Sequence, residues 1–142
     1  MTRVLQAGRK DPQSGQARSA VVFLHGYGAN GADLLGLADP LAEHLPDTLF
    51  VAPDAPDLDA FLDALMVDED LLPEQVVLFG FSQGTMMALH VAPRREDEVA
   101  GIVAFSGRLL RPDLLVDETR SRPPVLLVHG DADDVVPVQS LP

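Results

Sequence analysis

Short apolar runs of strand length recur along the chain, with more polar stretches between them. The runs are nearly continuous rather than alternating, which is typical of strands buried on both faces of a parallel sheet. They cover residues 20–24, 48–51, 75–80, 99–105 and 125–129. Before the first run, residues 8–19 are polar and rich in turn formers, so they predict a loop.

Helical periodicity lies between these runs and is clearest over 57–70. One face of that helix carries apolar residues at the spacing i, i+3, i+4, i+7 and i+8, and Asp57 is a candidate N-cap. Residues 32–45 are also expected to be helical, with a break at Pro40. A further helix is predicted over 83–92. Strands alternating with helices predict an α/β fold with a mostly parallel sheet and helices on both faces.

The sharp turn at Ser82 is the strongest chemical signal. The sequence Gly-Phe-Ser-Gln-Gly over 80–84 follows the strand 75–80 and precedes a helix. A nucleophilic serine needs such a strained turn to project from the carboxyl edge of a sheet, and the flanking small residues let neighbouring backbone approach. The helix N-terminus adds positive potential where negative charge develops. A glycine-lined turn with an incidental serine is the alternative interpretation.

A glycine-rich loop follows the strand 20–24, in the sequence His-Gly-Tyr-Gly-Ala-Asn-Gly over 25–31. It lacks the lysine and spacing of the phosphate-binding motifs. We therefore interpret it as an oxyanion loop, in which the backbone N–H groups of Tyr27 and Gln83 would hold the oxyanion. A plain strand–helix turn is the alternative.

Three acids, Asp131, Asp133 and Asp134, follow the strand 125–129. One acid at a strand end would orient a catalytic histidine. A cation site is the other interpretation, although the acids lack the spacing of a calcium loop, and we expect no metal.

Composition narrows the class of protein. The 142 residues are 46% hydrophobic and 23% charged, as expected for one globular domain over 1–142. The net charge of −12 disfavours nucleic acid and anionic membrane surfaces as partners. Cysteine is absent, and no apolar run reaches the roughly 20 residues of a membrane span, so we expect no membrane insertion and a cytoplasmic location.

Together these segments resemble the carboxylesterase/phospholipase family of α/β hydrolases, which includes the acyl-protein thioesterases. The likeness is carried, in the family's order, by residues 23–38, 51–56, 76–90, 99–110 and 123–137. It implies an α/β-hydrolase fold, Ser82 as nucleophile, Asp133 as the acid, and Tyr27 and Gln83 as oxyanion donors. The implied activity is hydrolysis of small acyl esters or thioesters without a cofactor.

Two departures from the family pattern stand out. The family has more chain after the segment 51–56, usually with a tryptophan, whereas here Pro56 runs directly into the helix at Asp57 and tryptophan is absent. The family's catalytic histidine also lies well downstream of the acid, whereas the nine residues after Asp133 contain none.

None of the four histidines is a good substitute. His90 lies eight residues after Ser82 on the same helix, about 12 Å along its axis. His44 is expected at the surface, and His25 and His129 are expected to brace strand ends.

Two interpretations follow. We favour a hydrolase core that lacks segments after Pro56 and after Pro142, which would supply the histidine. The alternative is a complete chain that acts as a non-catalytic pseudoenzyme or binding module. An apolar face left uncovered by missing elements would favour a homodimer.

Overall fold

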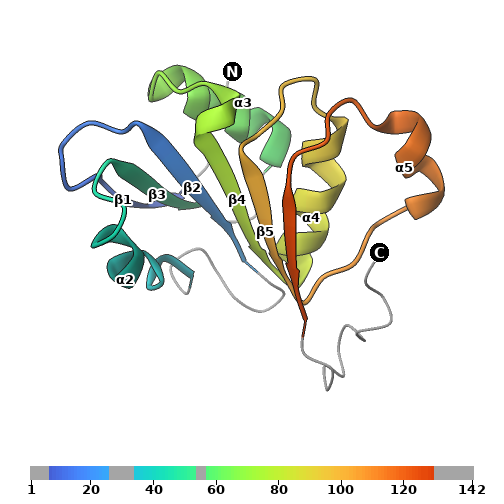
Figure 1. The fold of residues 1–142 in the computed structure, drawn as a ribbon, viewed down its shortest axis with the longest axis horizontal. Helices are drawn as coiled ribbons and strands as arrows, with labels where there is room; N and C mark the ends of the chain where they lie inside the picture. The colour runs from blue at the N-terminus through green and yellow to red at the C-terminus, as the bar shows by residue number, and fades with distance from the viewer. Residues whose placement is uncertain (1–6, 26–33, 54–56, 130–142) are drawn as a thin grey trace.

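A six-stranded sheet forms the centre of the molecule (Figure 1). The computed structural model describes residues 7–25, 34–53 and 57–129. The strand order is β1-β3-β2-β4-β5-β6, and only β1 runs antiparallel to its neighbour. The strands are β1 (Ala7–Lys10), β2 (Ser19–Leu24), β3 (Thr48–Pro53), β4 (Val76–Phe81), β5 (Gly101–Phe105) and β6 (Val125–Val128).

The helices lie on both faces of this sheet, so the predicted α/β architecture is confirmed. In α3, Leu58, Leu62 and Leu65 are buried, and the Asp57 carboxylate accepts a hydrogen bond from the Ala60 N–H at 3.3 Å, as the capping prediction requires. The helices are α2 (Ala38–Ala42), α3 (Leu58–Asp68), α4 (Gln83–Val91) and α5 (Pro112–Glu118), with short 3₁₀ turns η1 (Pro73–Gln75) and η2 (Ala92–Arg94).

Side chains alternate between the two faces of the sheet and build two separate cores. Residues such as Val22, Leu78 and Ile102 pack on the face covered by α3 and α4. Phe23 and Phe50 point to the other face, where they meet α2. Rings on this second face form a row of aromatic contacts across the sheet, Phe50–Phe23–Phe79–Phe105, with centroids 6.0, 5.2 and 5.2 Å apart.

Two local predictions are wrong. Residues 8–10 belong to strand β1 rather than a loop, because they pair with β3 across a long sequence separation. Pro40 does not break the helix over 32–45, since it lies in the first turn of α2, where its missing N–H costs no helical hydrogen bond. The interruption of the helix over 32–45 falls before Ala38 instead.

Helix α5, which the hydrophobic pattern did not predict, follows Arg111, a residue in the left-handed conformation.

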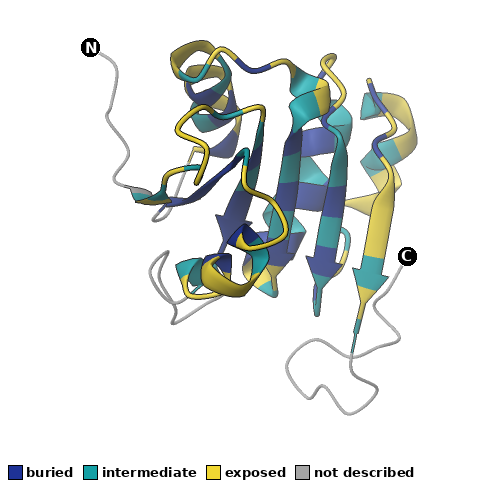
Figure 2. Cartoon of the chain, turned by 60° about the vertical axis from the view of Figure 1, so that its left-hand side comes forward, coloured by how far each residue is buried: buried dark blue, intermediate teal, exposed yellow. Residues whose placement is uncertain are grey.

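The edge strand β6 is the third departure from expectation. Its four apolar residues predict a strand buried on both faces, yet Val125, Leu126 and Val128 are 43%, 59% and 38% exposed. Figure 2 shows β6 largely exposed beside the dark, buried central strands. Among the described residues no strand pairs with its outer edge. The homodimer suggested by such a face stays a prediction.

Within the described ranges, none of the helices has the length and apolarity needed to cross a membrane.

Arg95 ties α3 to the segment that leads from α4 to β5. Its side chain is only 7% exposed, and its guanidinium donates to the carboxylates of Asp59 at 2.5 Å and Asp63 at 2.7 Å. Burial lowers the pKa of Arg95, but the hydrogen bonds to Asp63 and Asp59 outweigh it, and the pKa lies above its ordinary value. Arg95 therefore stays charged and joins two successive turns of α3.

We expect the double variant Asp59→Asn/Asp63→Asn to lose about 1–2 kcal/mol of unfolding free energy. Removing both partners leaves a buried cation uncompensated, although the two-thirds exposure of the carboxylates moderates the loss. Urea unfolding measures this, with Asp68→Asn, an exposed position on the same helix, as the control. Equal stability of the double variant and the control would contradict the role of Arg95.

Candidate active site

The carboxyl ends of four parallel strands meet at one edge of the sheet. The register aligns Leu24 with Gly80, Phe81 with Phe105, and Phe105 with Val128. The residues that directly follow these strands are therefore brought to the same edge. They are His25, Ser82, Ser106 and His129.

Ser82 forms the turn between β4 and α4, as the sequence predicts. Its φ of 54° and ψ of −113° lie in a region that non-glycine residues seldom adopt, which costs about 1–3 kcal/mol. Ser82 is also the N-cap residue of α4, but its side chain makes no capping hydrogen bond. The hydroxyl is thus not used to cap the helix, unlike that of an ordinary N-cap serine.

Backbone hydrogen bonds hold this turn on both sides. The Ser82 N–H donates to the Phe105 carbonyl at 2.9 Å, which fastens the turn to the end of β5. The Ser82 carbonyl accepts from the Met86 N–H at 3.1 Å and so starts the helix. Ser82 therefore joins two neighbouring strands and one helix through its main chain.

The glycines around Ser82 are required by close backbone contacts. A Cβ on Gly84 would overlap the Leu24 carbonyl, and a Cβ on Gly80 would lie 2.6 Å from the Thr85 backbone. There is likewise no room for a side chain at Gly107, because a Cβ there would overlap the Thr85 side chain. The first turn of α4 can therefore sit directly on the ends of β2, β4 and β5 only where these side chains are absent.

Gln83 is the first residue of α4, so its N–H has no acceptor within the helix. This N–H makes no hydrogen bond in the part of the chain that the structure describes. A donor of this kind, next in the chain to a serine nucleophile, would be suited to binding an oxyanion. Tyr27, the other predicted donor, and Asp133, the predicted acid, lie outside the described residues.

The histidines occupy different parts of the fold. His44 lies just beyond α2 and is exposed, as expected. His90 is in the last turn of α4, at the end far from Ser82. His25 and His129 directly follow β2 and β6, and each has an interaction partner.

The sequence reasoning missed two polar residues near Ser82. Thr85 is 1% exposed and donates its hydroxyl to the Phe105 carbonyl at 2.7 Å. Ser106 has a φ of 52°, and its N–H donates to the Val128 carbonyl at 2.9 Å. For Thr85, the sequence did offer a local signal, since a threonine next to a glycine in the first turn of a helix is placed close to neighbouring backbone. Nothing in the local pattern indicated the conformation of the second.

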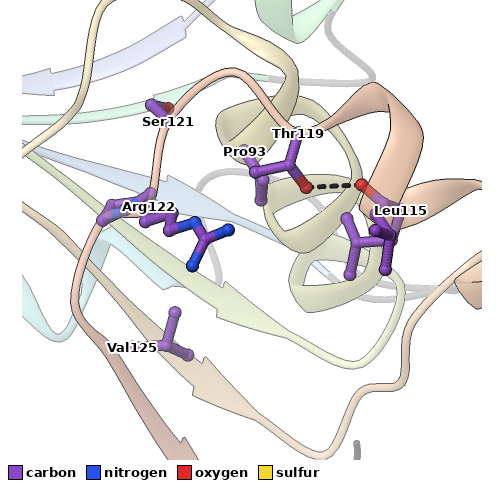
Figure 3. A pocket seen from close by; sticks show the side chains of 8 residues that line it. Pro93, Leu115, Thr119, Ser121, Arg122 and Val125 are labelled. Carbon is purple, nitrogen blue, oxygen red and sulfur yellow. Dashed lines mark hydrogen bonds between the residues drawn. The ribbon is translucent and has the colours of Figure 1, made fainter.

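A cavity of about 290 Å³ lies away from Ser82, toward the amino-terminal end of β6 (Figure 3). Pro93 of η2, Leu115 and Thr119 from α5 and its end, and Val125 line it, and Arg122 reaches in from the loop before β6. Because it opens at the opposite end of the strands, we do not assign it to the acyl group of a substrate. In the described ranges, no cluster of three metal-binding side chains occurs.

The fold and the turn at Ser82 define an α/β hydrolase, and solved structures agree. Esterase PE8 superposes with a TM-score of 0.94 and 39% sequence identity, covering 96% of this chain and 79% of that chain. A phospholipase/carboxylesterase from Dyadobacter fermentans superposes with a TM-score of 0.77 at 26% identity, covering 99% of this chain and 79% of that one.

The sequence profile of the phospholipase/carboxylesterase family matches residues 57–141. Acyl-protein thioesterase 1 of Saccharomyces cerevisiae is 30% identical, over 86% of this chain and 73% of the yeast protein. The chain therefore belongs to the phospholipase/carboxylesterase family, as the resemblance implied.

We expect Gly84→Ala to lower the unfolding free energy by at least about 2 kcal/mol, because its methyl group would overlap the Leu24 carbonyl. In an isolated helix the same change would stabilise by about 1 kcal/mol, so the sign of the effect is diagnostic. Gly101→Ala is the control, since its Cβ would lie 3.4 Å from the nearest atom. A stabilised Gly84→Ala protein would contradict the close contact.

Proposed function

We propose that this protein is a serine hydrolase that cleaves small carboxylic esters or thioesters through an acyl-enzyme on Ser82. The observation that carries the proposal is the strained turn at Ser82, whose hydroxyl makes no capping bond while the neighbouring Gln83 N–H is available. Membership of the phospholipase/carboxylesterase family and likeness to esterases and an acyl-protein thioesterase support it.

The proposed reaction has two stages. A base removes the Ser82 proton as Oγ attacks the acyl carbonyl, and the resulting oxyanion accepts hydrogen bonds from the Gln83 and Tyr27 N–H groups. The protonated base then gives its proton to the departing alcohol or thiol, which leaves an ester on Ser82. Water, deprotonated by the same base, attacks this ester; as the acyl–Oγ bond breaks, the base returns the proton to Ser82 Oγ and the acid is released.

The proposed base is a histidine that Asp133 orients. His44 and His90 do not suit this role, because one is exposed beyond α2 and the other lies at the far end of α4. A general base must come within hydrogen-bond reach of the proton it takes, directly or through one water. His25 and His129 directly follow β2 and β6, where we expect them to brace the strand ends. The proposal therefore assigns the base to none of these four histidines.

We expect a fluorophosphonate to label the protein once, at Ser82, and Ser82→Ala to abolish both labelling and p-nitrophenyl ester hydrolysis. The phosphorus centre takes the place of the acyl carbon, so labelling reports the nucleophile itself. Intact-mass and peptide mass spectrometry measure the site. Ser106→Ala is the matched control, since Ser106 follows the neighbouring strand at the same edge and should leave labelling unchanged. Unchanged hydrolysis in Ser82→Ala would overturn the assignment of Ser82 as nucleophile. A protein with Ser82 intact that is neither labelled nor hydrolytic would favour a binding module.

We also expect His44→Gln and His90→Gln to keep the labelling rate within about twofold of the unsubstituted protein. Loss of a true general base would lower it by about 10²–10⁴-fold. The rate of fluorophosphonate labelling between pH 6 and 9 tests each variant. A loss of that size in His90→Gln would assign the base to α4 and contradict the proposed arrangement.

A further inference from the structure

Thr85 lies where the nucleophile turn, α4 and the end of β5 meet. It is the third residue of α4, and only 1% of its surface is exposed. Its hydroxyl donates to the Phe105 carbonyl at 2.7 Å. The same carbonyl accepts the Ser82 N–H at 2.9 Å. One oxygen atom at the end of β5 thus accepts one hydrogen bond from the turn and one from the helix that follows it.

The hydroxyl is not needed simply to satisfy this carbonyl. The Ser82 N–H already gives the Phe105 oxygen one hydrogen bond, which is the ordinary requirement for a buried carbonyl. Valine would fill the same volume without bringing a buried hydroxyl into the core. The hydrogen bond of Thr85 is therefore an additional restraint at this point.

Packing fixes the position of the Thr85 side chain as closely as the hydrogen bond does. A Cβ on Gly107 would overlap the Thr85 methyl and lie 3.2 Å from the Ser82 carbonyl oxygen. A Cβ on Gly80 would lie 2.6 Å from the Thr85 Cα atom. Thr85 therefore occupies the space between two glycines that flank the turn, and it has little room to move.

The conformation of Ser82 makes such a restraint necessary. A residue held at a φ of 54° tends to relax unless its surroundings determine its position more than once. Ser82 has one hydrogen bond on each side, to Phe105 and from Met86. If the Phe105 carbonyl turned away, the first of these would break, and the turn could relax.

We propose that Thr85 is a positioning residue that holds the Phe105 carbonyl against the Ser82 N–H and thereby keeps the turn in its strained conformation. Thr85 acts through the main chain and does not touch the substrate. Its consequence for catalysis rests on the proposed role of Ser82, whereas its effect on the turn does not.

Three variants test this proposal. Thr85→Val keeps the shape and removes the hydroxyl, and Thr85→Ser keeps the hydroxyl and removes the methyl. Thr48→Val is the matched control, because Thr48 is also buried, at 4% exposure, and its hydroxyl bonds to Ser19 at 2.8 Å at the start of β3. All three are made in the protein as its own cell produces it and compared at a temperature where each is folded.

Amide hydrogen exchange followed by NMR measures how well the hydrogen bonds of the turn are held, independently of any activity. In Thr85→Val, we expect the Ser82 and Met86 amides to exchange about tenfold faster, which corresponds to the loss of one net hydrogen bond. Amides of Leu78 and Val22 in the central strands should not change relative to Thr48→Val. Thr85→Ser should retain the protection. Unchanged exchange at Ser82 in Thr85→Val would overturn the proposal.

The rate of fluorophosphonate labelling then measures how the change in the turn affects the reactivity of Ser82. In Thr85→Val, we expect the maximal labelling rate to fall about five- to tenfold while the concentration for half-maximal rate stays the same, and Thr85→Ser to restore it. Faster exchange with an unchanged labelling rate would overturn the link between the turn and reactivity. If Ser82 of the unsubstituted protein is not labelled, the proposed function fails, and the exchange data still decide whether Thr85 holds the turn.

Discussion

The structure depends on one close contact, between the first turn of α4 and the backbone at the end of β2. At this contact a side chain on Gly84 would occupy the same space as the Leu24 carbonyl. Because the helix begins so near the sheet, Ser82 must reverse the chain within a single residue, and it adopts a positive φ to do so. The same turn leaves the N–H of Gln83, the next residue along the chain, without an acceptor within the helix. Geometry that a hydrolase would use is thus a direct consequence of how tightly a helix is packed.

Much of this arrangement could be predicted from the sequence because its causes are local. The spacing of apolar residues in α3, its Asp57 cap and the glycines around Ser82 each act within a few residues of the chain. The features that escaped prediction depend on distant partners. Strand β1 exists because it pairs with β3, and the role of Thr85 depends on a carbonyl 20 residues away. The effect of Pro40 depends on where the helix begins, and α2 begins only two residues before it.

The two edge strands of the sheet, β1 and β6, differ in the charge that their side chains carry. β1 ends in Arg9 and Lys10, both of which form ion pairs, and such charges discourage pairing with another chain. β6 contains no charged residue. The N–H groups of Ile102 and Ser106 reach the carbonyls of Pro124 and Val128, so the alternate residues of β6 turn their backbone groups to the open edge. Among the described residues, a chain of net charge −12 thus has one edge strand without a charged side chain.

The hydrogen bond from the Ser82 N–H to the Phe105 carbonyl also connects Ser82 to the loop after β5. This loop contains Ser106 and ends at Arg111, and both have a positive φ, so the chain changes direction sharply at each end. Any displacement of the loop that rotates the Phe105 peptide alters both hydrogen bonds to its oxygen together. The Ser82 turn is thus mechanically connected to the loop after β5. Under the proposed function, this loop would adjust the reactivity of Ser82 from a position that never contacts the substrate.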